Sequence, residues 1–198
     1  METLTTAQAA FVLGEPLDNF KKVVERSPVK PDMVKRGGRR IRQFGTADLV
    51  FLHAYDELKQ AFTPKIQSEL YHALKSTMNG RHEKLVTFGN HRYDISGHVR
   101  DIEKKVKELD RLNAQIDASG KDPLIRGTKI EAHRIAALLD AGASIRQILQ
   151  DYPKLTESQI TAAKFFAEAH PKAGRPYPKQ TAKAAMRNAD LSALDDLD

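Results

Sequence analysis

Residues 5–49 read TTAQAAFVLGEPLDNFKKVVERSPVKPDMVKRGGRRIRQFGTADL, and this stretch decides how the N-terminal part of the chain folds. Thr5 and Gln8 have the spacing of a capping box, which predicts a helix that begins there. Gly14 suits the left-handed turn that ends such a helix. Pro16 then fits the first turn of a second helix, expected over residues 17–26. Pro28 and Pro31 end that helix.

A glycine pair within the stretch MVKRGGRRIRQF predicts a β-hairpin. Gly37 and Gly38 supply the positive φ angles that a two-residue hairpin turn needs, and short strand-forming runs lie on both sides. After the hairpin, Thr46 is expected to cap a third helix, and Thr63 with Pro64 to begin a fourth. The sequence therefore predicts two helices, a hairpin and two more helices.

The middle of the chain predicts a second hairpin over residues 84–95, followed by a long amphipathic helix. The apolar stripe of that helix consists of Val99, Ile102, Val106, Leu109, Leu112 and Ile116. Its first four members fit a heptad seam. Two interpretations remain open, namely packing into the core of the protein and a helix that forms a dimer.

The C-terminal part predicts a bundle of three short helices. A short strand-forming pattern at residues 124–130 precedes a helix that ends at Gly142. Two further capping boxes begin at Ser144 and Thr156, and each predicts a helix of its own. Together the three helices indicate a tri-helical unit of helix-turn-helix type. After Pro171 we expect an extended segment and then a mobile tail.

Charge is distributed unevenly along the 198 residues, which carry a net charge of +6. Residues 21–42 hold nine basic and two acidic side chains, a local balance of +7. Residues 171–187 hold five basic side chains and no acid, whereas the last nine residues, DLSALDDLD, hold four aspartates. Such basic segments favour polyanionic partners, although a charge run can also be a solvated face.

Several classes of protein are excluded by composition. The chain has no cysteine, which excludes disulfides, zinc fingers and thiol catalysis. It has no long apolar run and no signal-like start, so we expect no membrane span and a cytoplasmic location. Its seven histidines show no tight metal spacing, and neither the pair His91 and His98 nor the triplet Ser96-Gly97-His98 predicts a metal or catalytic site. We expect no enzyme, no metal and no cofactor.

Residues 123–176 contain three short motifs, which are Arg126-Gly127-Thr128 with Ile130, Gly142 with Ser144, and Tyr152-Pro153 with Leu155-Thr156. With these motifs the segment, about a quarter of the chain, resembles the bacterial family called domain of unknown function 433. The family usually has proline and valine where this chain has Glu131 and Ala132. This departure falls in a turn and leaves the other motifs intact.

The first 60 residues resemble, in outline, the winged helix-turn-helix of the MerR class. The shared features are Thr-x-x-Gln-Ala-Ala at residues 5–10, the Gly14 turn, the basic hairpin, and Phe44 followed by Thr46, Asp48 and Leu49. A winged helix-turn-helix of this kind ahead of the family domain is similar to the arrangement in VapB-type antitoxins. Those are often encoded beside a toxin with a PIN-like ribonuclease fold, so the resemblance implies an antitoxin that binds its toxin and represses its own promoter.

We therefore expect a mainly α (α+β) chain with four parts. These are a MerR-like winged helix-turn-helix DNA-binding domain at residues 1–78, a hairpin and amphipathic helix at 79–120 that connect or dimerise, the tri-helical family domain at 121–176, and a mobile tail at 177–198. Since one such motif reads few base pairs, we expect a homodimer or a higher hetero-oligomer with the toxin.

The expected DNA contacts come from the second helix and the basic hairpin, since such a helix enters the major groove and the wing lies along the backbone. The residues are Asp18, Asn19, Lys21, Lys22, Arg36, Arg39, Arg40 and Arg42. The last helix of the tri-helical unit has a mixed face that suits protein docking or dimerisation better than DNA. In the C-terminal segment 171–198, Arg175 or Lys179 is expected to reach the metal-binding carboxylates of the toxin.

Two other functions remain open. The chain is a stand-alone transcription regulator if it has no toxin partner. It is a protein-only adaptor if its basic patch meets an acidic protein rather than double-stranded DNA from its own promoter. The two differ in one observable, because only the adaptor lacks affinity for DNA.

Overall fold

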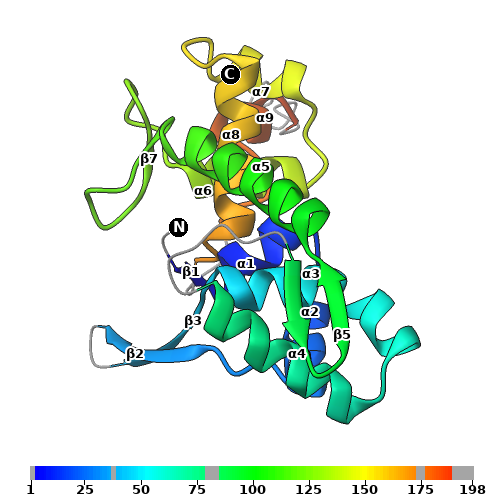
Figure 1. The fold of residues 1–198 in the computed structure, drawn as a ribbon. Coiled ribbons are helices and arrows are strands. Elements are labelled where there is room, and N and C mark those ends of the chain that lie inside the picture. The colour runs from blue at the N-terminus through cyan, green and yellow to red at the C-terminus, as the bar shows by residue number, and fades with distance from the viewer. Residues whose placement is uncertain (1–2, 37–38, 79–84, 173–176, 189–198) are drawn as a thin grey trace, which may run out of the picture. The chain divides into compact units, whose positions relative to one another are not determined.

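The computed structural model describes residues 3–36, 39–78, 85–172 and 177–188. The chain divides into two compact units (Figure 1). Unit 1 is Met1–Asp110 with Glu168–His170, and unit 2 is Arg111–Ala167 with Pro171–Asp198. The described part is mainly helical with small antiparallel sheets, which confirms the α+β class. Within this part, none of the helices is both long enough and apolar enough to cross a membrane.

Unit 1 begins with a short strand, which was not predicted, followed by the two predicted helices. These are β1 (Leu4–Thr5), α1 (Thr6–Leu13) and α2 (Leu17–Arg26). The backbone N–H of Gln8 donates to the Thr5 hydroxyl over 3.4 Å, and the Thr5 N–H donates to the Gln8 side-chain oxygen over 3.0 Å. Gly14 has φ +69° and ends α1. The capping box and the glycine stop are therefore both confirmed.

The predicted basic hairpin is also present. Strands β2 (Asp32–Arg36) and β3 (Arg39–Phe44) pair antiparallel, and β1 adds to the other side of β3, giving the order β1-β3-β2. In this register Lys35 lies opposite Arg40, and Met33 lies opposite Arg42. The turn residues Gly37 and Gly38 lie outside the described part of the chain.

Helices α3 (Thr46–Ala61) and α4 (Pro64–Thr77) follow the hairpin. The prediction that Thr46 caps α3 is wrong by one residue. Gly45 occupies the capping position, because its N–H donates to the Asp48 carboxylate over 2.8 Å and Thr46 is already helical. Pro64 lies in the first turn of α4, but the Thr63 side chain makes no capping hydrogen bond.

The second hairpin and the long helix complete unit 1. They are β4 (Leu85–Phe88), β5 (His91–Asp94) and α5 (Ser96–Asn113). Ile102 and Leu109 are buried, and Val99 and Val106 pack against the same core, so core packing accounts for these four stripe positions. Ile116 was expected on this helix, but the helix ends at Asn113 and Ile116 lies in a strand.

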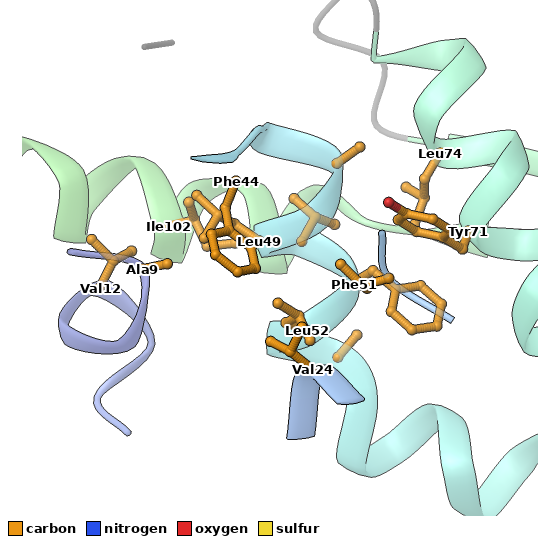
Figure 2. Close-up of a cluster of buried hydrophobic side chains, with 14 of the residues drawn as sticks. Ala9, Val12, Val24, Phe44, Leu49, Phe51, Leu52, Tyr71, Leu74 and Ile102 are labelled. Atoms are coloured by element: carbon orange, nitrogen blue, oxygen red, sulfur yellow. The ribbon is translucent and has the colours of Figure 1, made fainter. Parts of the chain in front are cut away.

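The core of unit 1 gathers apolar side chains from all of these helices. Figure 2 shows Ala9, Val12, Val24, Phe44, Leu49, Phe51, Leu52, Tyr71, Leu74 and Ile102 from α1, α2, β3, α3, α4 and α5. The ring of Phe51 meets the ring of Tyr71 edge-on at 5.4 Å between centroids. This core fixes the orientation of α2 and of the hairpin, which carry the charged residues discussed below.

Unit 2 contains the predicted tri-helical arrangement. A strand pair, β6 (Ile116–Asp117) and β7 (Leu124–Ile125), precedes α6 (Ala132–Asp140), α7 (Ile145–Asp151) and α8 (Glu157–Ala169). The capping boxes at Ser144 and Thr156 are both formed. The core of this unit includes Ile135, Leu138, Ile148, Ile160, Ala163 and Phe166.

The segment after the tri-helical bundle differs from the prediction of an extended and then mobile tail. Residues 182–188 form a further helix, α9 (Ala182–Asn188). Just before it, Thr181 is buried with 7% of its surface exposed, and its hydroxyl bonds to the Asp151 carboxylate of α7. The segment is therefore held to unit 2 at Thr181 and is helical as far as residue 188, and the remaining residues lie outside the described part.

Candidate nucleic-acid interface

The first element of the candidate interface is α2, the second helix of the predicted helix-turn-helix. Phe20 and Val24 face the core with at most 5% of their surface exposed, and the ring of Phe20 packs edge-on against Phe44 at 5.2 Å. Because these two residues are buried, the opposite face of the helix is directed to solvent. The predicted contact residues Asp18, Asn19, Lys21 and Lys22 are all exposed on α2.

Two of these four side chains already have acidic partners. Lys21 Nζ lies 3.0 Å from Asp18 Oδ1, and Asn19 Nδ2 donates to Glu15 Oε2 over 2.5 Å. Ion pairs between exposed side chains contribute little and exchange readily for other partners. Lys21 and Asn19 can therefore release these acids and turn to a ligand, while Lys22 next to them adds an exposed cation.

The second element is the β2–β3 hairpin. Side chains alternate between the two faces of a strand, so the register places Lys35, Arg40 and Arg42 on one face together with Met33. Lys35 and Arg40 are exposed and lie directly opposite each other. Such a group of cations can bind successive phosphates of a nucleic-acid backbone. The backbones of Arg36 and Arg39 pair with each other, but their side chains lie outside the described residues.

A buried network anchors the start of the hairpin and was not predicted. The hydroxyl of Tyr71 on α4 donates to Asp48 Oδ1 over 2.6 Å and accepts from the backbone N–H of Lys30 over 3.1 Å. Lys75 Nζ lies 3.2 Å from the same carboxylate oxygen. Lys30 is two residues before β2, so this network ties the entry of the hairpin to α3 and α4.

The environment keeps Tyr71 protonated. Burial of the ring and the hydrogen bond to Asp48 raise its pKa well above the ordinary value for tyrosine. The hydroxyl therefore donates to Asp48 throughout the physiological pH range. Asp48 was noticed in the sequence only as part of the Thr-x-Asp-Leu pattern, and its partner lies 23 residues away, so no local signal indicated the pair.

A second polar cluster in unit 1 is formed by histidines. His53 Nδ1 of α3 lies 2.9 Å from His98 Nδ1 of α5, and His98 Nε2 lies 3.2 Å from the Tyr93 hydroxyl. Burial and the nearby His53 lower the pKa of His98. His91 instead stacks on Phe88 at 5.4 Å between ring centroids, so His91 and His98 have separate partners. Across the described residues, no three or more His, Asp or Glu side chains are grouped to hold a metal ion.

The two residues expected to contact a toxin are placed less completely. Lys179 is exposed in the segment before α9, and Arg175 lies outside the described residues. The backbone on both sides of Lys179 is fixed, because the carbonyls of Pro178 and Gln180 accept hydrogen bonds from Arg134.

Comparison with known proteins finds a family whose model matches part of unit 2. Residues 117–167 match the family described as Protein of unknown function (DUF433), which supports the resemblance noted for this region. The chain is also 37% identical, over 86 residues, to the uncharacterized protein y4eO of Sinorhizobium fredii (strain NBRC 101917 / NGR234). That alignment covers 41% of this chain and 39% of the relative, so the chain spans about two fifths of the length of this curated protein. No solved structure was found to match the chain.

Proposed function

We propose that the protein is a DNA-binding antitoxin of a type II toxin–antitoxin pair, which neutralises a PIN-like ribonuclease toxin and represses its own operon. The observation that carries the DNA-binding part is the set of cations on α2 and on one face of the β2–β3 hairpin. They are the exposed Lys22, Lys35 and Arg40 and the half-buried Arg42. The order of two helices followed by a hairpin supports the proposal of a winged helix-turn-helix.

In this proposal α2 enters the major groove and the hairpin follows the backbone. Asn19 and Lys22 are near the exposed start of α2, where amide and ammonium groups reach base edges. Four cations that each neutralise one phosphate give a log–log salt slope of about −4. A dimer doubles the contacts and reads two half-sites, which is why we propose a homodimer on the operator.

The antitoxin part is supported by the resemblance of the chain to VapB-type antitoxins and by the family match in unit 2. An arginine or lysine inserted among the metal-binding carboxylates of a ribonuclease displaces the metal ion or blocks its site. We assign this role to Lys179 and Arg175 in the basic segment of the tail. Lys179 is exposed and therefore accessible to a partner.

DNA binding is tested with the duplex from immediately upstream of the gene and a scrambled duplex, by fluorescence anisotropy at low and moderate salt. The proposal expects tight binding to the upstream duplex and much weaker binding to the scramble. If both duplexes bind equally and the affinity is lost at higher salt, the binding is only nonspecific charge attraction. This outcome contradicts an autorepressor. No binding to either duplex favours a protein-only adaptor.

The toxin arm is tested with the protein encoded by the neighbouring gene. We expect the wild-type chain to co-purify with it and to restore growth of cells that express it. The double variant Arg175→Ala with Lys179→Ala is expected to lose most of this rescue while it keeps its DNA affinity. Full rescue by the double variant contradicts the assigned residues, and a missing complex with the wild-type chain favours a stand-alone regulator.

A further inference from the structure

Within unit 2, an arginine of α6 binds the main chain of residues 177–181. Arg134 of α6 donates from Nη1 to the carbonyl of Pro178 and from Nη2 to the carbonyl of Gln180, both over 2.9 Å. The two acceptors are main-chain oxygens two residues apart. The planar fork of a guanidinium group matches such a pair of acceptors, and the hydrogen bonds are charge-assisted.

Both ends of this segment are fixed by hydroxyl groups. The Tyr177 hydroxyl bonds to the Glu131 carboxylate and lies 2.7 Å from Lys172 Nζ, which also lies 5.0 Å from the centre of the Tyr177 ring. Four residues later, the Thr181 hydroxyl bonds to the Asp151 carboxylate. Burial and the bond to Glu131 raise the pKa of Tyr177, so its hydroxyl remains a donor. The surface therefore recognises a tyrosine and a threonine, with two carbonyls between them.

The residues that recognise the segment and the segment itself belong to different parts of the chain. Glu131, Arg134 and Asp151 lie within the range that matches the family, residues 117–167, whereas residues 177–181 lie beyond it. The contacts of Arg134 are made to main chain, and Lys179 between them is exposed. The family domain thus carries a surface able to hold a polypeptide segment, which in this chain is filled by a segment from outside the matched range.

We propose that Glu131, Arg134 and Asp151 form a polypeptide-binding site, and that residues 177–181 are a latch that fills it. The ligand class is a segment of a partner protein with a tyrosine and a threonine four residues apart and two accessible main-chain carbonyls between them. A partner segment competes with the latch for the site. The proposal goes beyond DNA binding and toxin neutralisation. It does not depend on DNA binding, because it uses residues of unit 2 that have no part in the proposed DNA contacts. It does not depend on toxin neutralisation, because Glu131, Arg134 and Asp151 are not the residues assigned to the toxin, although Lys179 lies within the latch.

The site is tested in the full-length chain with a fluorescent peptide of residues 176–182, PYPKQTA. The latch variant Tyr177→Ala with Thr181→Ala removes both hydroxyl contacts and is expected to bind the peptide saturably. The wild-type chain is expected to bind it about ten-fold more weakly, because a tethered segment competes at an effective concentration on the order of millimolar. Lys129→Ala, which alters an exposed side chain outside the latch, is the matched control and should behave as wild type.

Specificity is tested by two further changes. Adding Arg134→Gln to the latch variant should weaken peptide binding about ten-fold or more, because two charge-assisted hydrogen bonds are lost. The peptide PFPKQVA, which lacks both hydroxyls, should bind more weakly than PYPKQTA. The proposal is overturned if a latch variant with wild-type circular dichroism shows no saturable binding, if it binds no more tightly than wild type, or if Arg134→Gln has no effect.

A second measurement does not depend on the latch variant. Trypsin cleaves after Lys179, and a bound latch protects this bond. In an otherwise wild-type chain, Arg134→Gln should accelerate this cleavage, whereas cleavage after the exposed Lys129 should be unchanged and serves as the internal control. Equal rates of cleavage after Lys179 in the two proteins would show that Arg134 does not hold the latch and would overturn the proposal.

Discussion

Replacing Tyr71 with phenylalanine removes one oxygen atom from the network that anchors the hairpin. That hydroxyl donates to the fully buried Asp48 over 2.6 Å and accepts from the Lys30 N–H over 3.1 Å. A hydrogen bond to a charged group contributes about 1.5–3 kcal/mol, and the Asp48 oxygen keeps Lys75 as a partner. We therefore expect Tyr71→Phe to lower the free energy of unfolding of unit 1 by about 2 kcal/mol.

The assay is urea unfolding at pH 7, followed by far-UV circular dichroism, with the transition of unit 1 assigned by hydrogen exchange. Tyr55→Phe is the matched control, because the Tyr55 hydroxyl donates to the neutral carbonyl of Arg26 over 3.1 Å at an exposed site. Its loss should cost about 1 kcal/mol or less. In both variants the free energy of unfolding should change with urea concentration by the same slope as in the wild type, since neither substitution changes the surface buried on folding.

The difference between wild type and Tyr71→Phe should also depend on pH. The pKa of Tyr71 is raised in the folded state, so its contribution to stability is complete below pH 10 and is lost as the pH rises above that value. The cost of the substitution should therefore be constant from pH 7 to pH 9 and shrink above pH 10. Equal costs for Tyr71→Phe and Tyr55→Phe at pH 7, or a cost that does not shrink above pH 10, would refute the anchoring role.

Three other predictions concern unit 1. Lys35→Ala with Arg40→Ala should weaken DNA binding in an anisotropy titration and reduce by about 2 the slope of log affinity against log salt concentration. An unchanged slope would exclude the hairpin from the DNA contacts. Gly14→Ala should lower the free energy of unfolding by about 1–2 kcal/mol, because Gly14 has φ +69°. Gly97→Ala is the control, because a Cβ atom there also meets no neighbour but the residue is helical, and it should raise the free energy of unfolding by up to about 1 kcal/mol. Thermal melts of both variants measure the difference. Because the pKa of His98 is lowered in the folded state, its contribution to stability is complete above pH 6.5 and is lost as the pH falls. His98→Gln should therefore reduce the fall in the free energy of unfolding between pH 7 and pH 5. An equal fall in variant and wild type would contradict this prediction.

The parts of the fold that the sequence predicted are those in which all the interacting atoms lie within a few residues. The capping boxes at Thr5 and Ser144 join a hydroxyl to a backbone amide three residues away, and each was predicted with its helix. The same holds for the basic hairpin, whose strands pair in sequence order. The α5 helix was predicted too long because its apolar period continues to Ile116, although the chain turns after Asn113.

The parts that were not predicted depend on residues far apart in the chain. Asp48 and Tyr71 are 23 residues apart, His53 and His98 are 45 apart, and Arg134 bonds to a carbonyl 44 residues away. No spacing rule links such residues, because the contact exists only after the helices have packed. The exposure of the proposed DNA-contact residues on α2 could be predicted, since the position of Phe20 on the helix already indicates which face is buried.

The DNA-binding proposal and the latch proposal can be separated because they use different residues in different units. The proposed DNA contacts lie in Met1–Asp110, and the latch with its site lies in Arg111–Ala167 and Pro171–Asp198. If the units act independently, Arg134→Gln leaves DNA affinity unchanged, and Lys35→Ala with Arg40→Ala leaves peptide binding unchanged. If the units are coupled, reciprocity requires that peptide binding alters DNA affinity by the same factor by which DNA alters peptide affinity. Measuring both affinities with and without the other ligand decides between these cases, and unequal factors would mean that one titration reports something other than binding.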